Sequence, residues 1–196
     1  ISQEKYELAG LQELYELDKK YPDYPKVAAR IIARESNGWY NVFTIDKGSE
    51  DGIQINMNVM AGNGLAGIVT AVRKNSATVR SIIDDNSYVS GMFARTSDIC
   101  DVKGDLETIN DGYISVERIS VDAEIEDGME IVTSYVSDRY LEGILIGYVN
   151  NIEKDANNMT MTARLTPVVN FDRLDTVLVI TELKHSEELE DMTQYD

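Results

Sequence analysis

Hydrophobic and polar residues alternate along most of this chain in short runs, and glycine-containing turns separate the runs. The pattern is clearest between residues 46 and 72, where a turn at Gly48 and Gly52 leads to a short apolar run, and a second turn leads to a longer run starting at Gly64. Alternation over four to eight residues between turn signals is typical of half-buried β-strands. This stretch therefore predicts a short strand, a tight turn and a longer strand.

The same design returns in the second half of the chain. Glu126-Asp127-Gly128-Met129 repeats the turn Glu50-Asp51-Gly52-Ile53, and Gly143–Val149 repeats the start of the longer strand at Gly64–Val69. The offset between the two copies is roughly 76 to 80 residues. Both halves are therefore expected to contain the same small β unit.

Further short runs between turns extend this unit to six strands in each copy. Residues 27–34 fit a helix or a strand by periodicity, but a turn at residues 35–38 and the β-rich run after it favour a hairpin. The predicted strands are 27–34, 39–46, 58–61, 64–72, 78–83 and 88–95 in the first copy, and 98–103, 112–118, 130–134, 144–152, 160–168 and 175–181 in the second. Many short strands with few helices indicate barrels or sandwiches. Gly91, inside the sixth run, indicates a bulge or a sharp bend.

The first part of the chain has a helical pattern instead. Apolar residues line one side of the predicted helix, and the expected coiled-coil seam consists of Leu8, Leu11, Leu14 and Tyr15. Two heptads are too few for a secure dimer, so the segment is interpreted as the end of a longer coiled coil or as a short helix that caps a β domain. The Tyr-Pro sequence at Pro22 ends it, because proline disfavours helical conformation in the residue before it.

These patterns predict a mainly β protein with two small six-stranded β-barrel-like domains preceded by an N-terminal helix. The expected divisions are residues 1–22 for the helix, 24–97 for the first barrel, 98–183 for the second, and 184–196 for an acidic, disordered tail. The chain begins with Ile rather than Met, so we expect it to be part of a longer protein whose N-terminal anchor is missing.

The charge of the chain argues against nucleic acid as a partner. The formal net charge is −17 at pH 7, and non-specific affinity for DNA or RNA depends on Lys and Arg displacing counterions. No apolar run approaches the roughly 20 residues that a membrane-spanning helix requires. The chain itself is therefore expected to meet a membrane only through the missing anchor.

Catalytic side chains do not gather in a recognisable pattern. Residues 62–67 satisfy the G-x-G-x-x-G spacing of dinucleotide-binding loops, but β-branched residues follow where a helix must begin, so a glycine hairpin is the better interpretation. His185, the only histidine, lies in the acidic tail, so a catalytic triad lacks its imidazole and a zinc site lacks ligands. Cys100, the only cysteine, is expected to be a buried apolar residue. No catalytic residue, metal or cofactor is predicted.

Paired carboxylates are the remaining candidates for chemistry. Glu50-Asp51, Asp84-Asp85 and Glu126-Asp127 all occur in turns, where such side chains commonly accept hydrogen bonds from the local backbone. A hydrolase that uses a pair of them stays open as an alternative. The glycines of the repeated unit are interpreted as structural turn residues, and they are Gly48, Gly52, Gly64, Gly67, Gly128 and Gly147.

Four segments in a fixed order carry a family resemblance. They are the helical segment ending at Tyr21-Pro22, the run 47–52 (KGSEDG), the run 64–69 (GLAGIV), and Thr166-Pro167 followed by 174–180 (LDTVLVI). As an ordered set covering residues 5–183, they resemble the MreC family of bacterial rod-shape-determining proteins. The family more often has Leu-Val-Gly where this chain has Leu65-Ala66-Gly67, and the acidic tail is not a feature of the family core.

The resemblance implies a single-pass membrane protein with a short cytoplasmic start, a coiled coil, and two β-barrels on the extracytoplasmic side. It implies no enzymatic activity. It implies a homodimer or larger assembly that links MreB, through MreD, to a RodA-type polymerase and to a class B penicillin-binding transpeptidase, whose activity it promotes by contact. On this interpretation, strand edges and apolar grooves bind partners and further copies of the chain. A carboxylate-dependent cell-wall hydrolase or a generic extracellular adhesion module are the alternatives.

Overall fold

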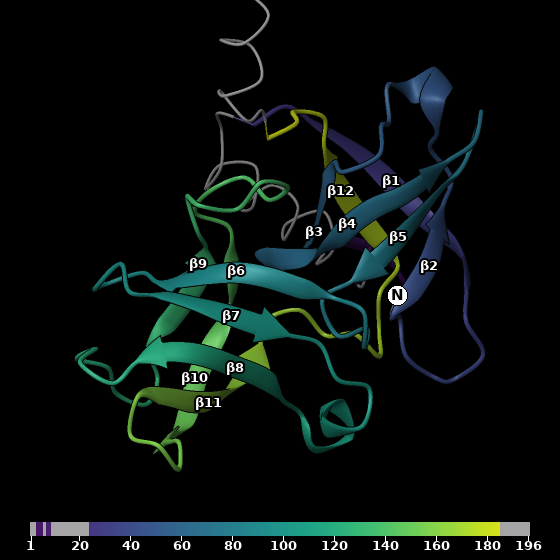
Figure 1. Cartoon of the computed structure of the whole chain (residues 1–196). Coiled ribbons are helices and arrows are strands. Elements are labelled where there is room, and N and C mark those ends of the chain that lie inside the picture. Colours follow the sequence, from purple (N-terminus) through teal and green to yellow (C-terminus); the bar gives the residue numbers. More distant parts are fainter. Residues whose placement is uncertain (1–2, 6, 9–23, 185–196) are drawn as a thin grey trace, which may run out of the picture.

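The computed structural model, which describes residues 3–5, 7–8 and 24–184, contains two closed six-stranded antiparallel barrels (Figure 1). The prediction of two six-stranded barrels is confirmed. The first barrel consists of β1 (Lys26–Arg34), β2 (Val42–Ile45), β3 (Asn58–Ala61), β4 (Gly64–Val72), β5 (Ala77–Ser81) and β12 (Thr176–Ile180). The second consists of β6 (Tyr88–Phe93), β7 (Ile99–Lys103), β8 (Ile114–Ser120), β9 (Glu130–Thr133), β10 (Leu145–Lys154) and β11 (Thr160–Pro167). Two short 3₁₀ helices, η1 (Ser49–Asp51) and η2 (Thr108–Asp111), lie in the loops.

Apolar side chains at alternate positions of each strand fill the interior of each barrel. In the first, pairing places Phe43 of β2 opposite Val79 of β5, which in turn lies opposite Val69 of β4, and all three are fully buried. In the second, Val102 of β7 lies between Val89 of β6 and Val116 of β8 in the same way. Burial of such a side chain contributes about 1.5 to 3 kcal/mol, so the inward rows supply the main stabilisation of both barrels.

The two barrels have the same strand order but exchange their sixth strands. Around the first barrel the order is β1-β12-β3-β4-β5-β2, and around the second it is β7-β6-β9-β10-β11-β8. Strands β1 to β5 therefore correspond to β7 to β11, and β12 corresponds to β6. Each copy of the repeat supplies five strands to its own barrel and one strand to the other.

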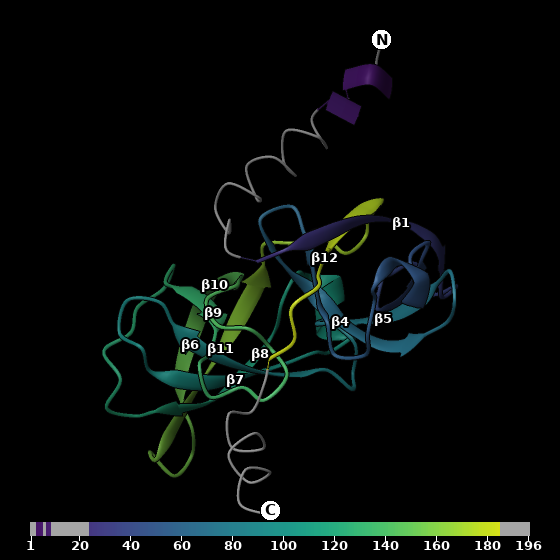
Figure 2. The ribbon, with the colours of Figure 1, turned by 90° about the horizontal axis from the view of Figure 1, so that it is seen from above.

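The barrels consequently do not coincide with the expected domains 24–97 and 98–183. Residue 97 separates two runs of six strands in the sequence, but β6 closes the second barrel and β12 closes the first. The pattern of apolar residues identifies a strand and its buried face, but it does not identify the strand's neighbours. The two barrels lie side by side in Figures 1 and 2.

Closure of both barrels restricts the strand edges to which a partner could add a strand. Every strand in the described part of the chain has a hydrogen-bonded neighbour on each side. A closed barrel limits the unpaired edge on which strand addition depends to places where a strand extends past its neighbour. Residues 150–154 of β10, for example, pair with β11 but extend beyond the register with β9.

Gly91 does not produce the predicted bulge. Its strand, β6, pairs with β7 and β9 without a register shift. A Cβ atom at this position would lie 2.9 Å from the Ile131 Cγ2 atom, so the glycine instead makes room for a neighbouring core side chain.

Part of the predicted N-terminal helix is described. Residues 3–5 and 7–8 are helical, and the Leu8 side chain is exposed. Leu11, Leu14 and Tyr15 of the expected seam, and the tail from residue 185 onward, lie outside the described residues. Within the described residues, no helix combines the length and the hydropathy required to cross a membrane.

Candidate functional site

The repeated glycines build equivalent corners in the two barrels. Gly52 and Gly128 have φ angles of 85° and 93°, a left-handed conformation that favours glycine. Gly67 of β4 and Gly147 of β10 serve a different purpose. A Cβ atom would collide with the carbonyl oxygen of Arg80 at the first position and with that of Thr166 at the second. The two glycines thus allow the same close approach between corresponding strand pairs, β4–β5 and β10–β11.

Gly48 and Gly64 permit close approach at other places. A Cβ atom on Gly48 would collide with the carbonyl oxygen of Arg73, next to the β4–β5 turn. At Gly64 it would collide with the Val168 side chain, which follows β11 of the second barrel. Gly64 therefore lies where the two barrels touch.

Polar side chains join the barrels next to that contact. Asn58 of β3 is 1% exposed, and its Oδ1 atom accepts a hydrogen bond of 2.8 Å from the Leu141 backbone N–H. Its Nδ2 atom donates to the Arg139 carbonyl oxygen at 2.9 Å. Both partners belong to the loop between β9 and β10. One buried amide thus attaches a loop of the second barrel to a strand of the first.

A cavity of about 230 Å³ opens between the barrels near Trp39. The indole Nε1–H donates to Asn110 Oδ1 at 3.2 Å, which joins the β1–β2 loop to η2. The other wall is formed by the connection between β11 and β12, including Val168 and Phe171. These residues hold the barrels in contact, so the cavity is part of the junction.

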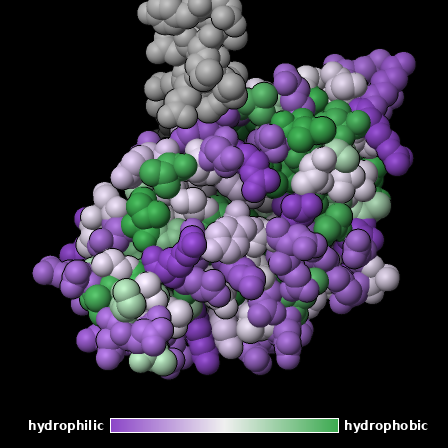
Figure 3. Space-filling view, viewed as in Figure 1, coloured by the Kyte–Doolittle hydropathy of each residue, from purple (hydrophilic) through white to green (hydrophobic). Residues whose placement is uncertain are grey.

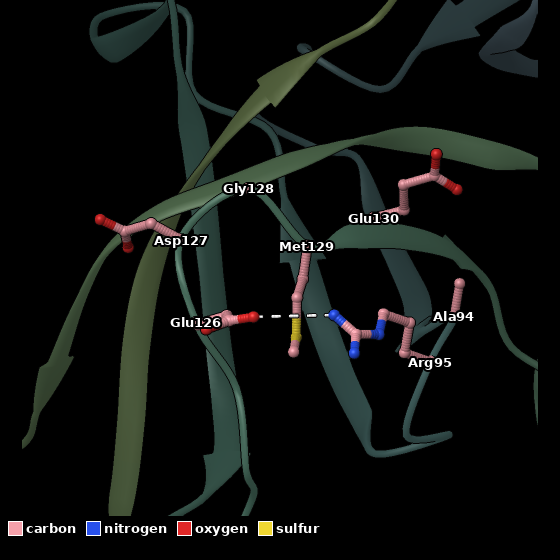
Figure 4. A pocket seen from close by; sticks show the side chains of 7 residues that line it. All are labelled: Ala94, Arg95, Glu126, Asp127, Gly128, Met129 and Glu130. Carbon is pink, nitrogen blue, oxygen red and sulfur yellow. Dashed lines mark ion pairs between the residues drawn. The ribbon is translucent and has the colours of Figure 1, made fainter.

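A larger cavity of about 410 Å³ lies at the end of the second barrel, between the β6–β7 turn and the Gly128 corner (Figure 4). Arg95 and Glu126 face each other across it, with Nη1 and Oε1 3.6 Å apart, and both side chains are exposed. Met129 lies between them, while the carboxylates of Asp127 and Glu130 point away from the pair. The cavity thus offers an apolar side chain and an exposed ion pair to a partner.

Two of the three carboxylate pairs found in the sequence, Glu50-Asp51 and Asp84-Asp85, contain side chains with structural hydrogen bonds. Asp51 Oδ2 accepts the Gly48 N–H at 3.0 Å, and Asp85 Oδ1 accepts the Leu106 N–H at 2.9 Å. Asp84, which is 6% exposed, accepts hydrogen bonds from the Asn41 side chain and the Asn86 backbone. Asp51 and Asp84 thus organise turns, as the sequence pattern indicated, whereas Asp85 joins its turn to the connection between β7 and η2.

The cysteine is poorly suited to act as a nucleophile. Cys100 is buried, and burial, aided by the nearby carboxylates of Asp101 and Asp98, raises the pKa of its thiol to about 12. The thiol therefore stays protonated near neutral pH. Among residues 3–5, 7–8 and 24–184, no group of three or more His, Cys, Asp or Glu side chains is arranged to hold a metal ion. His185 lies outside the described residues.

Sequence patterns identified the glycines but not the polar junction. Asn58 lies in a run that predicts an ordinary short strand, and its partners in the second barrel are more than 80 residues away in the sequence. An asparagine at the start of an apolar strand was the one available signal, because a buried amide requires hydrogen-bond partners.

Comparisons with known proteins agree with this architecture. Residues 31–181 match the family model described as rod shape-determining protein MreC, barrel core. The cell shape-determining protein MreC of Listeria monocytogenes is 29% identical over 182 residues, which cover 90% of this chain and 60% of that protein. The corresponding protein of Haemophilus influenzae is 24% identical over 185 residues, covering 92% and 50%. The chain therefore spans between half and three fifths of the length of these two relatives.

Solved structures show the same fold. An MreC structure superposes with a TM-score of 0.81 at 22% identity, covering 90% of this chain and 98% of that one. The major periplasmic domain of the cell shape-determining filament MreC gives 0.67 at 20% identity, covering 80% and 95%. A complex between a penicillin-binding protein, PBP2, and MreC from Helicobacter pylori contains a chain that gives 0.61 at 15% identity, covering 81% and 100%.

Proposed function

Because this chain belongs to the MreC family of cell shape-determining proteins, we propose that it is a non-enzymatic scaffold of the cell-wall elongation machinery. The observation that carries the proposal is the match of the family's barrel core to residues 31–181, which include almost all of both barrels. The structural hydrogen bonds of Asp51, Asp84 and Asp85 support a scaffold over a hydrolase that uses these carboxylates. No observation specifically favours an adhesion module.

We propose that the chain works on the extracytoplasmic side of the cell membrane and is held there by a single-pass anchor in the longer protein. Its partners would be further copies of itself, MreD, a RodA-type polymerase and a class B penicillin-binding transpeptidase. The solved complex of a penicillin-binding protein with a structural neighbour supports the last of these. Through MreD, the assembly would connect to MreB.

Contact with the transpeptidase would promote its activity if the chain binds the active conformation more tightly than the inactive one. We place this contact at the cavity of Figure 4, because Met129 and the exposed Arg95–Glu126 pair have no role in joining the barrels. The cavity near Trp39, in contrast, is part of the junction.

The test is the affinity of the chain for the extracytoplasmic part of the transpeptidase. Met129→Asp should raise the Kd about tenfold, because a buried contact of this size is worth more than 1 kcal/mol. Met159→Asp is the control for an added charge, since Met159 is 73% exposed, precedes β11 and is not among the residues that line the cavity. Because Met129 packs partly against the core, the circular dichroism spectrum and melting temperature of Met129→Asp must match those of the unaltered chain. No binding by the unaltered chain would overturn the partnership. Equal losses in both variants would remove the contact from this cavity.

A further inference from the structure

The dipeptide Asn-Gly occurs twice in the chain, at Asn37-Gly38 and at Asn63-Gly64. Asn37 lies in the loop between β1 and β2, Asn63 lies in the tight turn between β3 and β4, and both are exposed. An asparagine followed by glycine is open to spontaneous deamidation, because glycine has no side chain to hinder attack of its backbone nitrogen on the asparagine Cγ atom. The surroundings of each dipeptide then decide which asparagine reacts.

The reaction needs no reagent other than water. The glycine nitrogen forms a bond to Cγ of the asparagine, the Cγ–Nδ2 bond breaks, and ammonia leaves with the proton that the glycine nitrogen gives up. The product is a five-membered succinimide ring in the main chain. Water then adds to one of the two ring carbonyl carbons and the ring opens, which leaves aspartate or isoaspartate. Ring closure therefore requires a glycine nitrogen without a hydrogen-bond partner and a backbone that is free to rotate.

The β1–β2 loop meets both requirements at Asn37. Gly38 has a φ angle of 89°, and apart from its chain neighbours no atom lies within 4 Å of the place that a Cβ atom would take. Within the described residues, the Gly38 N–H donates to no other group. Asn37 Oδ1 accepts the Trp39 N–H at 2.9 Å, which folds the side-chain amide back along Gly38. A donor at this oxygen also stabilises the negative charge that develops on it during the attack.

Water has free access to this loop. Residues 33–38 are all exposed. In Figure 1 the loop hangs below β2 at the side of the first barrel, and the surface in the same region of Figure 3 is mostly hydrophilic. A succinimide formed here can therefore be hydrolysed without any movement of the barrels.

Asn63 is followed by the same residue but lacks the same freedom. Gly64 is buried and pairs with Ala61 in the ladder between β3 and β4. A Cβ atom on Gly64 would collide with the Val168 side chain, so its backbone lies directly against the second barrel. Ring closure would remove the Gly64 N–H and turn this backbone. The β3–β4 turn must therefore open locally before Asn63 can react.

Asn37 is also the outer end of a row of side-chain hydrogen bonds that leads into the protein. Its Nδ2 atom donates to Asn41 Oδ1 at 2.9 Å, and Asn41 Nδ2 donates to Asp84 Oδ1 at 3.0 Å. Asn41 and Asp84 are both buried. Deamidation replaces the donating amide of Asn37 by a carboxylate. Asn41 Oδ1 would then lose its donor and face a second acceptor, which is unfavourable at a buried position.

We propose that Asn37, and not Asn63, is a site of spontaneous deamidation, and that the modification loosens the β1–β2 loop from the junction of the barrels. The loop reaches the junction through Trp39, whose indole N–H donates to Asn110. Aspartate lacks the donor that Asn37 offers to Asn41, and isoaspartate adds one carbon to the main chain next to Trp39. Both products therefore disturb the hydrogen bonds around this tryptophan. The inference does not depend on the proposed function.

Mass spectrometry of the purified full chain tests the choice of site. The chain is kept warm in mildly alkaline buffer, which helps the glycine nitrogen to lose its proton, and samples are digested at intervals. The peptide that contains Asn37 should gain the mass of an exchange of NH₂ for OH at least about tenfold faster than the peptide that contains Asn63. This factor corresponds to about 1.4 kcal/mol in activation free energy.

Urea provides the control for this comparison, because both turns are unfolded in it and the two asparagines should then react at similar rates. Equal rates in the folded chain, or a faster reaction at Asn63, would overturn the proposal. A preference for Asn37 that persisted unchanged in urea would overturn it as well, since the fold would not be what selects the site.

The fluorescence of Trp39, the only tryptophan of the chain, measures the structural consequence. Asn37→Asp introduces the carboxylate directly. It should shift the emission to longer wavelength and lower the melting temperature by about 2 to 4 °C. Asn63→Asp adds the same charge to the other exposed turn and should leave the Trp39 emission unchanged. If Asn37→Asp kept both the emission and the melting temperature of the unaltered chain, the loop would not be loosened by the modification.

Discussion

At the scale of single residues, the glycines of the repeated unit serve two different physical purposes. Gly52 needs a left-handed backbone but has open space around its Cα atom, whereas Gly67 has an ordinary backbone and no space because the Arg80 carbonyl oxygen is too close. Both appear in the sequence as turn glycines. The repeat locates them, but only the packing of β4 against β5 distinguishes their functions.

Substitution by alanine should separate these purposes. Gly67→Ala should lower the free energy of unfolding by about 2 to 3 kcal/mol, because an added Cβ atom forces two paired strands apart. Gly52→Ala should cost about 1 kcal/mol, the price of a left-handed alanine. Urea denaturation followed by circular dichroism measures both. If both variants lost the same free energy of unfolding, the contact between β4 and the Arg80 carbonyl oxygen would not be what requires glycine at position 67.

The buried thiol predicts a pH dependence. The pKa of Cys100 rises from 9.0 to about 12 on folding, so the folded chain holds this proton more tightly than the unfolded chain. The contribution of the thiol to stability is therefore complete below about pH 9 and is lost as the pH rises toward 12. Between about pH 8 and pH 10.5, the free energy of unfolding of the unaltered chain should fall by roughly 2 kcal/mol more than that of Cys100→Ala. The free energy of unfolding is measured by urea denaturation at each pH. If it falls equally with pH in the unaltered chain and in Cys100→Ala, the raised pKa of Cys100 is contradicted.

At the scale of elements, the sequence predicted every strand that the structure contains, but not how the strands are shared. Runs such as 64–72 and 160–168 can be recognised as strands from the sequence alone, because alternation and flanking turns are local features. The assignment of β6 and β12 to opposite barrels depends on which surfaces fit, so no local pattern contains it. The junction at Asn58 and the cavity at Met129 were missed for the same reason.

The attachment of the β9–β10 loop, residues 134–143, to β3 gives a prediction at this scale. Asn58→Ala removes both hydrogen bonds to this loop and leaves the Leu141 N–H and the Arg139 carbonyl without their partner. The expected loss is about 2 to 3 kcal/mol, the cost of unpaired buried polar groups. Asn110→Ala breaks the exposed bond to Trp39 and should cost less than about 1 kcal/mol. Amide hydrogen exchange in residues 134–143 should become faster only in Asn58→Ala.

At the scale of the whole molecule, the exchanged strands make the two barrels mutually dependent. The outward residues of β12, Leu178 and Ile180, are buried although they face away from the first barrel's interior. The corresponding strand β6 carries Ser90 and Met92 on its outer side, and both are partly exposed. The two strands are therefore not interchangeable, although they occupy corresponding places in the strand order.

Cutting the chain after Ser97 tests this dependence. Each fragment, 1–97 and 98–196, contains six strands but lacks the sixth strand of its own barrel. If β6 moved into the place of β12, Gly91 would stand among inward positions that Val177 and Val179 now fill, leaving a void in the core. Each fragment alone should therefore unfold without a cooperative transition, and mixing them should restore one transition and the circular dichroism spectrum of the intact chain. A cooperative transition in either fragment alone would mean that a barrel can close with its own sixth strand, and that the exchange is a preference rather than a requirement.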